Sequence, residues 1–404
     1  MIDMNLTDIQ PLITVYHRKL AETTLTFKRY LYSHINWDVR MIGIKGEKGV
    51  GKTTLILQHI KETFPEPDEA LYVSLDNIWF SNHTLIDLAD FLYSMDIRHL
   101  FLDEVHKYPE WTRNLKNLYG NYPGLNIVYT GSSMLRIDNS VTDLSRRQTL
   151  YTLQNLSFRE YLEYSGVGTF QPHSLEEILS SHVKIAMDVT SQIKILKHFN
   201  DYLFMGVYPF FKEAGKDYHI RLQEVINQTL ESDLPAVENA TFETIQKAKK
   251  LLMIISEIVP FIPNTTQLCQ SLDTTRDSCL KLLYALDRAH VLHLLTAKLK
   301  SYKKLVNPDK ILLGNPNVMY ALGGKTEIGT IRDTFFANQV GRLYTLQYPA
   351  KGDFFACEKY LFEVGGKNKT FEQIKDEPDS FLAVDETETG YGSRIPLWLF
   401  GFLY

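Results

Sequence analysis

The sequence predicts an α/β fold built on a parallel sheet that is covered by helices. Short apolar runs alternate with helical patterns from residue 41 to about residue 150, which is typical of that class. Residues 46–53 read Gly-Glu-Lys-Gly-Val-Gly-Lys-Thr, a complete GxxxxGK[ST] motif between an apolar run and a helical segment. That strand–loop–helix setting is the one in which the motif forms a phosphate-binding loop.

The motif also predicts which residues hold a nucleoside triphosphate. Its glycines let backbone N–H groups turn inward around the phosphates. Lys52 is expected to reach the β- and γ-phosphates, and the Thr53 hydroxyl to ligate Mg²⁺. The expected ATP contacts are Gly46, Glu47, Lys48, Gly49, Val50, Gly51, Lys52, Thr53 and Thr54. The alternative is a glycine-rich surface turn, which gives this octet by chance in about one per cent of chains of this length.

Composition limits the class of protein. The 404 residues are enough for about two to four domains. A net charge of -5 argues against a uniformly basic surface, so any contact with nucleic acid needs a local patch. The three cysteines (Cys269, Cys279 and Cys357) form no CxxC pair, which argues against a zinc site and a disulfide framework. The sequence contains neither a signal peptide nor a long apolar stretch, so we expect a cytoplasmic protein without membrane contact.

The elements of the sheet can be placed in order. Residues 8–36 carry apolar positions at helical spacing, which predicts helices before the first strand. Helices are expected to begin near Gly51, Thr84 and Glu110. The expected strands are Arg40–Ile44, Leu71–Leu75, Ile97–Leu102 and Asn126–Thr130.

Two acids follow the strand expected at Ile97–Leu102. Such a strand is expected beside the first strand, where Asp103 would meet the Mg²⁺ shell from the side opposite Thr53. Glu104 would polarise the attacking water, a role that a kinase acting on a small alcohol does not need. The alternative is a buried strand that stops at two solvated acids. The pair therefore favours hydrolysis of the γ-phosphate over a P-loop kinase.

Small hydroxyl residues end the next strand, where the chain reads Thr-Gly-Ser-Ser from Thr130 to Ser133. A hydroxyl at that point would orient the water and sense the γ-phosphate. Ser132 is the first candidate and Thr130 the second. A turn that closes the strand is an equally good interpretation of these residues.

These motifs together resemble those of bacterial and archaeal AAA-like ATPases that carry a winged helix and a restriction-endonuclease-like domain after the ATPase core. The resemblance covers residues 40–165 well and the rest loosely, and it implies an AAA+/STAND-type core that uses ATP and magnesium. It supplies no substrate. The matching features are Gly46–Thr53, Leu102–Glu104, Thr130–Ser133 and Leu156–Leu162.

Arg146 and Arg147 precede the apolar run Thr149–Leu153, where related ATPases place an arginine finger. A finger reaches the γ-phosphate of a neighbouring subunit, so this interpretation implies a homo-oligomer. A pair of surface arginines is an equally good alternative.

The resemblance and the helical patterns together predict five segments. They are N-terminal helices (1–38), the ATPase core (39–156), a helical lid (157–240), a winged helix (241–325) and a small α/β nuclease-like domain (326–404). The winged helix is expected from helices at Phe242–Ile258, Thr266–Leu272 and Thr275–His290, followed by a strand at Val291–Leu295.

DNA contact would use the third of these helices and the basic stretch Lys298–Lys304. The helix offers Arg276, Lys281 and Arg288 against two aspartates, which makes a poor phosphate-binding face. Winged helices in ATPases also serve as packing or protein-contact modules, so the partner is either DNA or protein.

The last segment carries acids at two strand-like runs, Asp353–Ala356 and Tyr360–Val364, after a helix expected at Ile331–Leu343. A restriction-type nuclease would use Asp353, Glu363 and a lysine two residues later, and Asp333 would be a further acid. Gly365 stands at the lysine position.

The absence of that lysine favours a nuclease-like fold without efficient activity. The leading interpretation of the chain is an ATP-hydrolysing switch. The alternative is an ATP-gated, metal-dependent nuclease using Asp353, Glu363 and the displaced Lys367.

Overall fold

The structure is a computed structural model of the 404-residue chain. It describes residues 4–66, 69–132, 137, 144–232, 234–235, 241–257, 265–297, 306–323 and 327–404. The chain forms two compact units, Met1–Gln154 and Asn155–Tyr404.

A five-stranded parallel sheet forms the centre of the first unit, with the strand order β2-β3-β4-β1-β5. The strands are β1 (Met41–Lys45), β2 (Ala70–Ser74), β3 (His99–Asp103), β4 (Asn126–Gly131) and β5 (Thr149–Thr152). The sequence-based strands are confirmed, because the apolar runs are strands buried on both faces of the sheet. One expectation is wrong: β3 does not lie beside β1, because β4 pairs with both and separates them.

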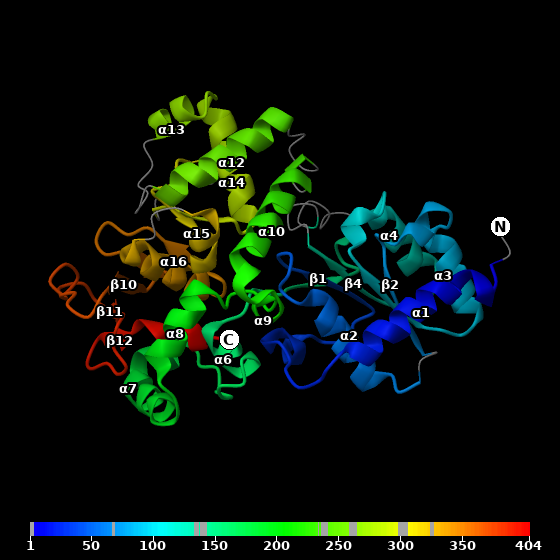
Figure 1. The fold of residues 1–404 in the computed structure, drawn as a ribbon, viewed down its shortest axis with the longest axis horizontal. Coiled ribbons are helices and arrows are strands. Elements are labelled where there is room, and N and C mark those ends of the chain that lie inside the picture. The colour runs from blue at the N-terminus through cyan, green and yellow to red at the C-terminus, as the bar shows by residue number, and fades with distance from the viewer. Residues whose placement is uncertain are drawn as a thin grey trace. The chain divides into compact units, whose positions relative to one another are not determined.

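Helices cover both faces of this sheet (Figure 1). The helical elements are α1 (Leu6–Glu22), η1 (Tyr30–His34), α2 (Lys52–Thr63), η2 (Ile78–Ser81), α3 (Leu85–Ser94), η3 (Val105–Lys107) and α4 (Trp111–Asn121). The connection from β1 to β2 crosses the sheet in one direction, and the connections from β2 through β3 to β4 return in the other. Right-handed crossovers therefore place α2 on one face and α3 and α4 on the opposite face.

The second unit begins with helices, as the sequence predicts for the lid segment 157–240. They are α6 (Phe158–Tyr164), α7 (Leu175–Gln192), α8 (Ile195–Phe204), α9 (Phe211–Ala214), η4 (Gly215–Asp217) and α10 (Tyr218–Ser232). Ser157 and Ser174 begin α6 and α7 with capping boxes, in which a glutamate three residues later bonds back to the serine N–H. The segment 205–210 separates α8 from α9.

Three helices and an antiparallel strand pair follow. They are α12 (Phe242–Glu257), α13 (Thr265–Ser271), α14 (Arg276–Arg288), β6 (Leu292–Leu295) and β7 (Lys310–Leu313). Thr275 caps α14, and its side chain accepts a hydrogen bond from the Ser278 N–H. Because α12 contacts α10 and α15 (Pro316–Leu322), these elements pack into the same compact unit as the preceding helices.

A mixed sheet with the order β12-β11-β10-β9-β8 ends the chain. Its strands are β8 (Leu346–Gln347), β9 (Phe354–Ala356), β10 (Tyr360–Gly365), β11 (Ser380–Val384) and β12 (Arg394–Pro396), followed by η5 (Leu397–Phe402). Helix α16 (Ile328–Gly341) packs on β10 and η5 and is buried on almost every side from Thr330 to Val340. The boundaries of the five predicted segments remain a prediction, and the last three segments lie in the second unit.

None of the helices in the described ranges combines the length and the apolar character needed to cross a bilayer.

Candidate ATPase site

The loop from Gly46 to Gly51 joins β1 to α2. Gly49 and Gly51 have φ values of 83° and 96°, a left-handed backbone conformation that side chains with a Cβ rarely adopt. A Cβ at Gly46 would collide with the Leu153 carbonyl oxygen. Gly51 is the N-cap of α2, so the loop delivers Lys52 and Thr53 to the first turn of that helix, where backbone N–H groups favour an anion.

Lys52 is only 5% exposed although it carries a charge. Its Nζ donates hydrogen bonds to the carbonyl oxygens of Gly46 and Glu47, both at 2.9 Å. The ammonium group is therefore held by the loop itself, close to the first turn of α2.

Arg29, in the N-terminal segment, stabilises the phosphate-binding loop through hydrogen bonds. Its buried guanidinium donates to the Val50 carbonyl oxygen at 2.5 Å and to that of Gln154 at 2.7 Å. The amide of Gln58, on α2, donates to the carbonyl oxygens of Thr24 and Phe27 in the same N-terminal segment. No sequence pattern identifies Arg29, because it lies outside the motif and acts through backbone carbonyls.

Asp103 lies at the end of β3, is 3% exposed, and accepts side-chain hydrogen bonds from two strands and a helix. Thr53 Oγ1 and the Tyr72 hydroxyl donate to its Oδ2 at 2.7 and 2.8 Å, and Thr130 Oγ1 donates to its Oδ1. Burial, with the nearby Asp103 carboxylate, raises the pKa of Tyr72, so Tyr72 stays a donor. Lys19 Nζ supports Tyr72 by donating to its hydroxyl at 2.9 Å.

The oxygens of Thr53 and Asp103 converge from α2 and β3 even though β4 separates β1 from β3. A hydroxyl and a carboxylate at this spacing are hard oxygen donors of the kind that Mg²⁺ prefers, so the residues fit that ion.

Glu104 follows Asp103 in a left-handed conformation, with φ 54° and ψ 39°. Its backbone N–H donates to Asp103 Oδ1 at 3.2 Å and to Thr130 Oγ1 at 3.4 Å. Its carboxylate oxygen Oε2 accepts from Ser132 Oγ at 2.9 Å and lies 3.3 Å from His106 Nε2. Burial raises the pKa of the Glu104 carboxyl. Both candidate hydroxyls thus contact the acid pair, and His106 joins them without a signal in the sequence.

Arg146 and Arg147 precede β5. Arg146 is exposed and has a φ of 70°, and Arg147 is half-buried. Within the described ranges, neither guanidinium bonds to the loop, Asp103 or Glu104.

The acids predicted near the C-terminus also come together, in the second unit. Asp353 Oδ2 accepts from the Val364 N–H at 2.9 Å, and Lys310 Nζ lies 2.8 Å from Asp333 Oδ2 and 3.6 Å from Asp353 Oδ1. The expectation that Lys367 is the displaced lysine is wrong, because Lys367 is exposed and Lys369 Nζ lies 2.5 Å from Glu363 Oε1.

The chain turns back after β10, with Lys369 N–H donating to the Gly366 carbonyl oxygen. This turn brings the side chain of Lys369 over Gly365, where a Cβ would stand 2.6 Å from the Lys369 Cβ and Cγ. Lys369 thus fills the space that a lysine at position 365 would use. The cation that the sequence lacks at position 365 is therefore supplied from position 369.

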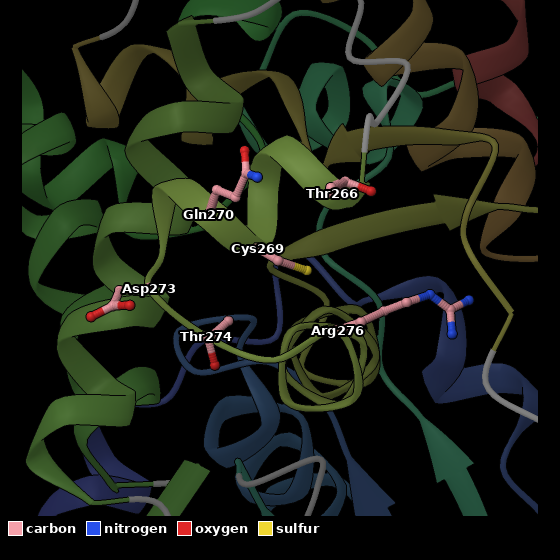
Figure 2. Close-up of a pocket in the computed structure, with 6 residues that line it drawn as sticks. All are labelled: Thr266, Cys269, Gln270, Asp273, Thr274 and Arg276. Atoms are coloured by element: carbon pink, nitrogen blue, oxygen red, sulfur yellow. The ribbon is translucent and has the colours of Figure 1, made fainter.

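A hollow at the turn from α13 to α14 is drawn in Figure 2. The Cys269 sulfur points into it, and Arg276 extends away from Asp273 and donates to Asn307 Oδ1 at 2.9 Å. Its residues are Thr266, Cys269, Gln270, Asp273, Thr274 and Arg276. All belong to the second unit, whereas the phosphate-binding loop belongs to the first.

The parallel sheet, the glycine loop and the acid pair resemble those of AAA-like P-loop ATPases. Residues 38–162 match the model of the family AAA_14, described as an AAA domain. An uncharacterized protein of Methanocaldococcus jannaschii is 27% identical over 370 residues, which cover 83% of this chain and 77% of that protein.

Two solved structures align with larger parts of this chain. The Walker-type ATPase of Pyrococcus abyssi aligns over 76% of this chain and 95% of its own, with 11% identity and a TM-score of 0.39. The AMPPCP-bound DnaA of Aquifex aeolicus aligns over 68% of this chain and 88% of its own, with 9% identity and a TM-score of 0.27.

Proposed function

We propose that this protein binds ATP with Mg²⁺, hydrolyses the γ-phosphate and works as a nucleotide-driven switch. The observation that carries the proposal is the 2.7 Å hydrogen bond between Thr53 Oγ1 and Asp103 Oδ2, beside a phosphate-binding loop that encloses Lys52. These are the parts that a P-loop ATPase uses to hold a triphosphate and its metal.

Each of these side chains has a role in this proposal. Thr53 and Asp103 would hold Mg²⁺, which when bound neutralises charge on the phosphates. When ATP binds, the Lys52 ammonium would give up its hydrogen bonds to the carbonyl oxygens of Gly46 and Glu47 and would donate to phosphate oxygens instead. Glu104 would take a proton from water as the water oxygen attacks the γ-phosphorus, and the bond from the γ-phosphorus to the β-phosphate oxygen would break to release ADP. The raised pKa of the Glu104 carboxyl makes its ionised form a stronger base for that step. Ser132 would orient the same carboxylate.

Replacing Lys52 by alanine tests the binding step. Because the alanine variant loses charged hydrogen bonds to the phosphates, its ATP affinity should be weaker by about 10- to 150-fold. Isothermal titration calorimetry measures the affinity directly. Lys116→Ala, which removes an exposed lysine from α4 of the same unit, is the matched control and should bind ATP like the parent. Equal affinity in the Lys52 variant would rule out the assignment.

A winged helix is supported by the order α12-α13-α14-β6-β7 and by the antiparallel pairing of its strands. Its cations are partly engaged within the chain. Lys281 Nζ lies 3.3 Å from Asp277 Oδ2, and Arg276 bonds to Asn307. The basic stretch Lys298–Lys304 lies outside the described residues. These contacts favour a packing or protein-contact module, and an ATPase assay with and without duplex DNA tests for a DNA partner.

We also propose that the C-terminal domain is nuclease-like but does not cut DNA efficiently, because Asp333 and Glu363 are already paired with Lys310 and Lys369. Supercoiled plasmid incubated with the protein, ATP and Mg²⁺ or Mn²⁺ should be nicked no faster than with the Glu363→Ala variant. The competing nuclease is favoured by Lys369, which supplies the cation expected at position 365. In that nuclease Lys369 would stabilise the transition state, and loss of such a group typically lowers the rate of cleavage by about 10²–10³. Parental nicking that disappears in both Glu363→Ala and Lys369→Ala, with ATPase activity retained, would establish the nuclease instead.

A further inference from the structure

The Asp103 carboxylate has a hydrogen-bond donor from outside the sequence motifs of the site. Tyr72, on β2, donates its hydroxyl hydrogen to Asp103 Oδ2 at 2.8 Å, and Thr53 Oγ1 donates to the same oxygen at 2.7 Å. The strand register pairs Tyr72 with Phe101, which shares a face of the sheet with Asp103 two residues later. Tyr72 is 1% exposed and Asp103 3%, so the bond is made away from water.

Lys19, in the last turn of α1, fixes the direction of the Tyr72 hydroxyl group. Its Nζ donates to the hydroxyl oxygen at 2.9 Å and lies 4.9 Å from the centre of the Tyr72 ring. An ammonium group donates hydrogen bonds and accepts none, so the hydroxyl hydrogen of Tyr72 is left to point at Asp103. The positive charge also polarises the phenol, which strengthens the bond that it donates. Lys19, Tyr72 and Asp103 therefore form one directed chain of hydrogen bonds.

Helix α2 holds the end of α1 that carries Lys19. The Lys61 side chain, on α2, donates to the carbonyl oxygens of Leu20 and Thr23 at 3.1 and 2.7 Å. α1 also packs on β2, the strand of Tyr72. Because α2 begins with the phosphate-binding residues Lys52 and Thr53, the same helix positions both the loop and the start of the hydrogen-bond chain.

We propose that Tyr72, oriented by Lys19, is a positioning residue of the ATPase site that holds the Asp103 carboxylate in the orientation in which it meets Mg²⁺. This inference rests on the proposed function. The Thr53 hydroxyl is expected to ligate the metal itself, whereas Tyr72 has no such task and keeps Asp103 Oδ2 fixed before and after the metal binds. Groups that orient a metal ligand in this way typically change metal affinity by about 10- to 100-fold.

The test measures ATP affinity by calorimetry in EDTA and at a series of Mg²⁺ concentrations, for the parent and for Tyr72→Phe. Phenylalanine fills the same space but donates no hydrogen bond. The affinity in EDTA should be unchanged. The Mg²⁺ concentration that gives half of the magnesium-dependent gain in affinity should rise by about 10- to 100-fold. Tyr122→Phe is the matched control, because the buried Tyr122 also donates its hydroxyl hydrogen to an aspartate, Asp90, and this variant should behave like the parent.

Variants of Lys19 separate the chain of hydrogen bonds from a general effect on the fold. Lys19→Met should raise the same Mg²⁺ concentration, but by less than Tyr72→Phe does. It should add nothing in the double variant Lys19→Met/Tyr72→Phe, because both changes act through one bond. Lys19→Arg keeps a charged donor and should resemble the parent. Lys28→Met is the control, because Lys28 Nζ also lies over a tyrosine ring of the same unit, that of Tyr32, and this variant should respond to Mg²⁺ like the parent.

The inference is overturned if Tyr72→Phe shows the parental response to Mg²⁺, or if the effects of Lys19→Met and Tyr72→Phe simply add. It is also overturned if Tyr72→Phe weakens ATP binding in EDTA as much as with Mg²⁺, since that result marks a general loss of the site. Failure of the proposed function gives a different result. The parent itself would then bind ATP no better with Mg²⁺ than in EDTA, and the positioning role would fall with it.

Discussion

Replacing Glu104 by glutamine is expected to leave ATP binding intact and to lower the rate of hydrolysis by about 10²–10⁴. The amide has nearly the shape of the carboxylate and can still accept a hydrogen bond from Ser132. It cannot accept the proton of the attacking water. Single-turnover hydrolysis of radiolabelled ATP, measured beside calorimetric ATP affinity, separates the chemical step from binding.

The chain offers a close control for this variant. Glu110, in the same unit, also has a left-handed backbone conformation, with φ 48°, and its exposed side chain pairs with Arg113. Glu110→Gln therefore repeats the same chemical change in a similar backbone setting and should hydrolyse ATP like the parent. Hydrolysis at the parental rate by Glu104→Gln would mean that another group activates the water.

Asp103→Asn probes the other acid. Asparagine would keep one oxygen for Thr53 or Tyr72 but lose the negative charge that a metal requires. We expect ATP binding that no longer responds to Mg²⁺, measured by repeating the titration with EDTA. A full magnesium response in the variant would place the metal elsewhere.

The strands of the first unit could be predicted because strands buried on both faces are continuous apolar runs, such as β1 and β3. The order of those strands could not. Hydrophobic periodicity identifies an element and its face but carries no information about which strand becomes its neighbour. The expectation that Asp103 lies on the strand next to β1 failed for this reason, since β4 pairs between them.

The residues of the candidate site also fall into two groups, those that the sequence predicts and those that it does not. Thr53 and Asp103 belong to motifs whose spacing reflects function, and the structure joins them by a hydrogen bond. Arg29 and His106 belong to no motif and are brought to the site by tertiary packing. Lys369 was missed because its position depends on a turn after β10, and a strand-based count of residues cannot anticipate that turn.

Arg146 and Arg147 are the candidates for an arginine finger that acts on a neighbouring subunit. If either is a finger that acts on a neighbouring subunit, its replacement by alanine should lower the ATPase rate by about 10³–10⁵ while ATP affinity is unchanged. The parental rate per molecule should also rise with protein concentration, because only assembled subunits supply the finger. Steady-state ATPase assays over a dilution series test both points.

The local structure gives this test its controls. Arg146 is exposed, so its guanidinium is accessible to a second copy. Arg113, an exposed arginine on α4 that pairs with Glu110, is the matched control, and Arg113→Ala should keep the parental rate. Mixing Arg146→Ala with Glu104→Gln should restore activity if the finger acts in trans, because each subunit then supplies what the other lacks. A rate that is independent of concentration, with near-normal activity in both arginine variants, would identify the two residues as surface charges.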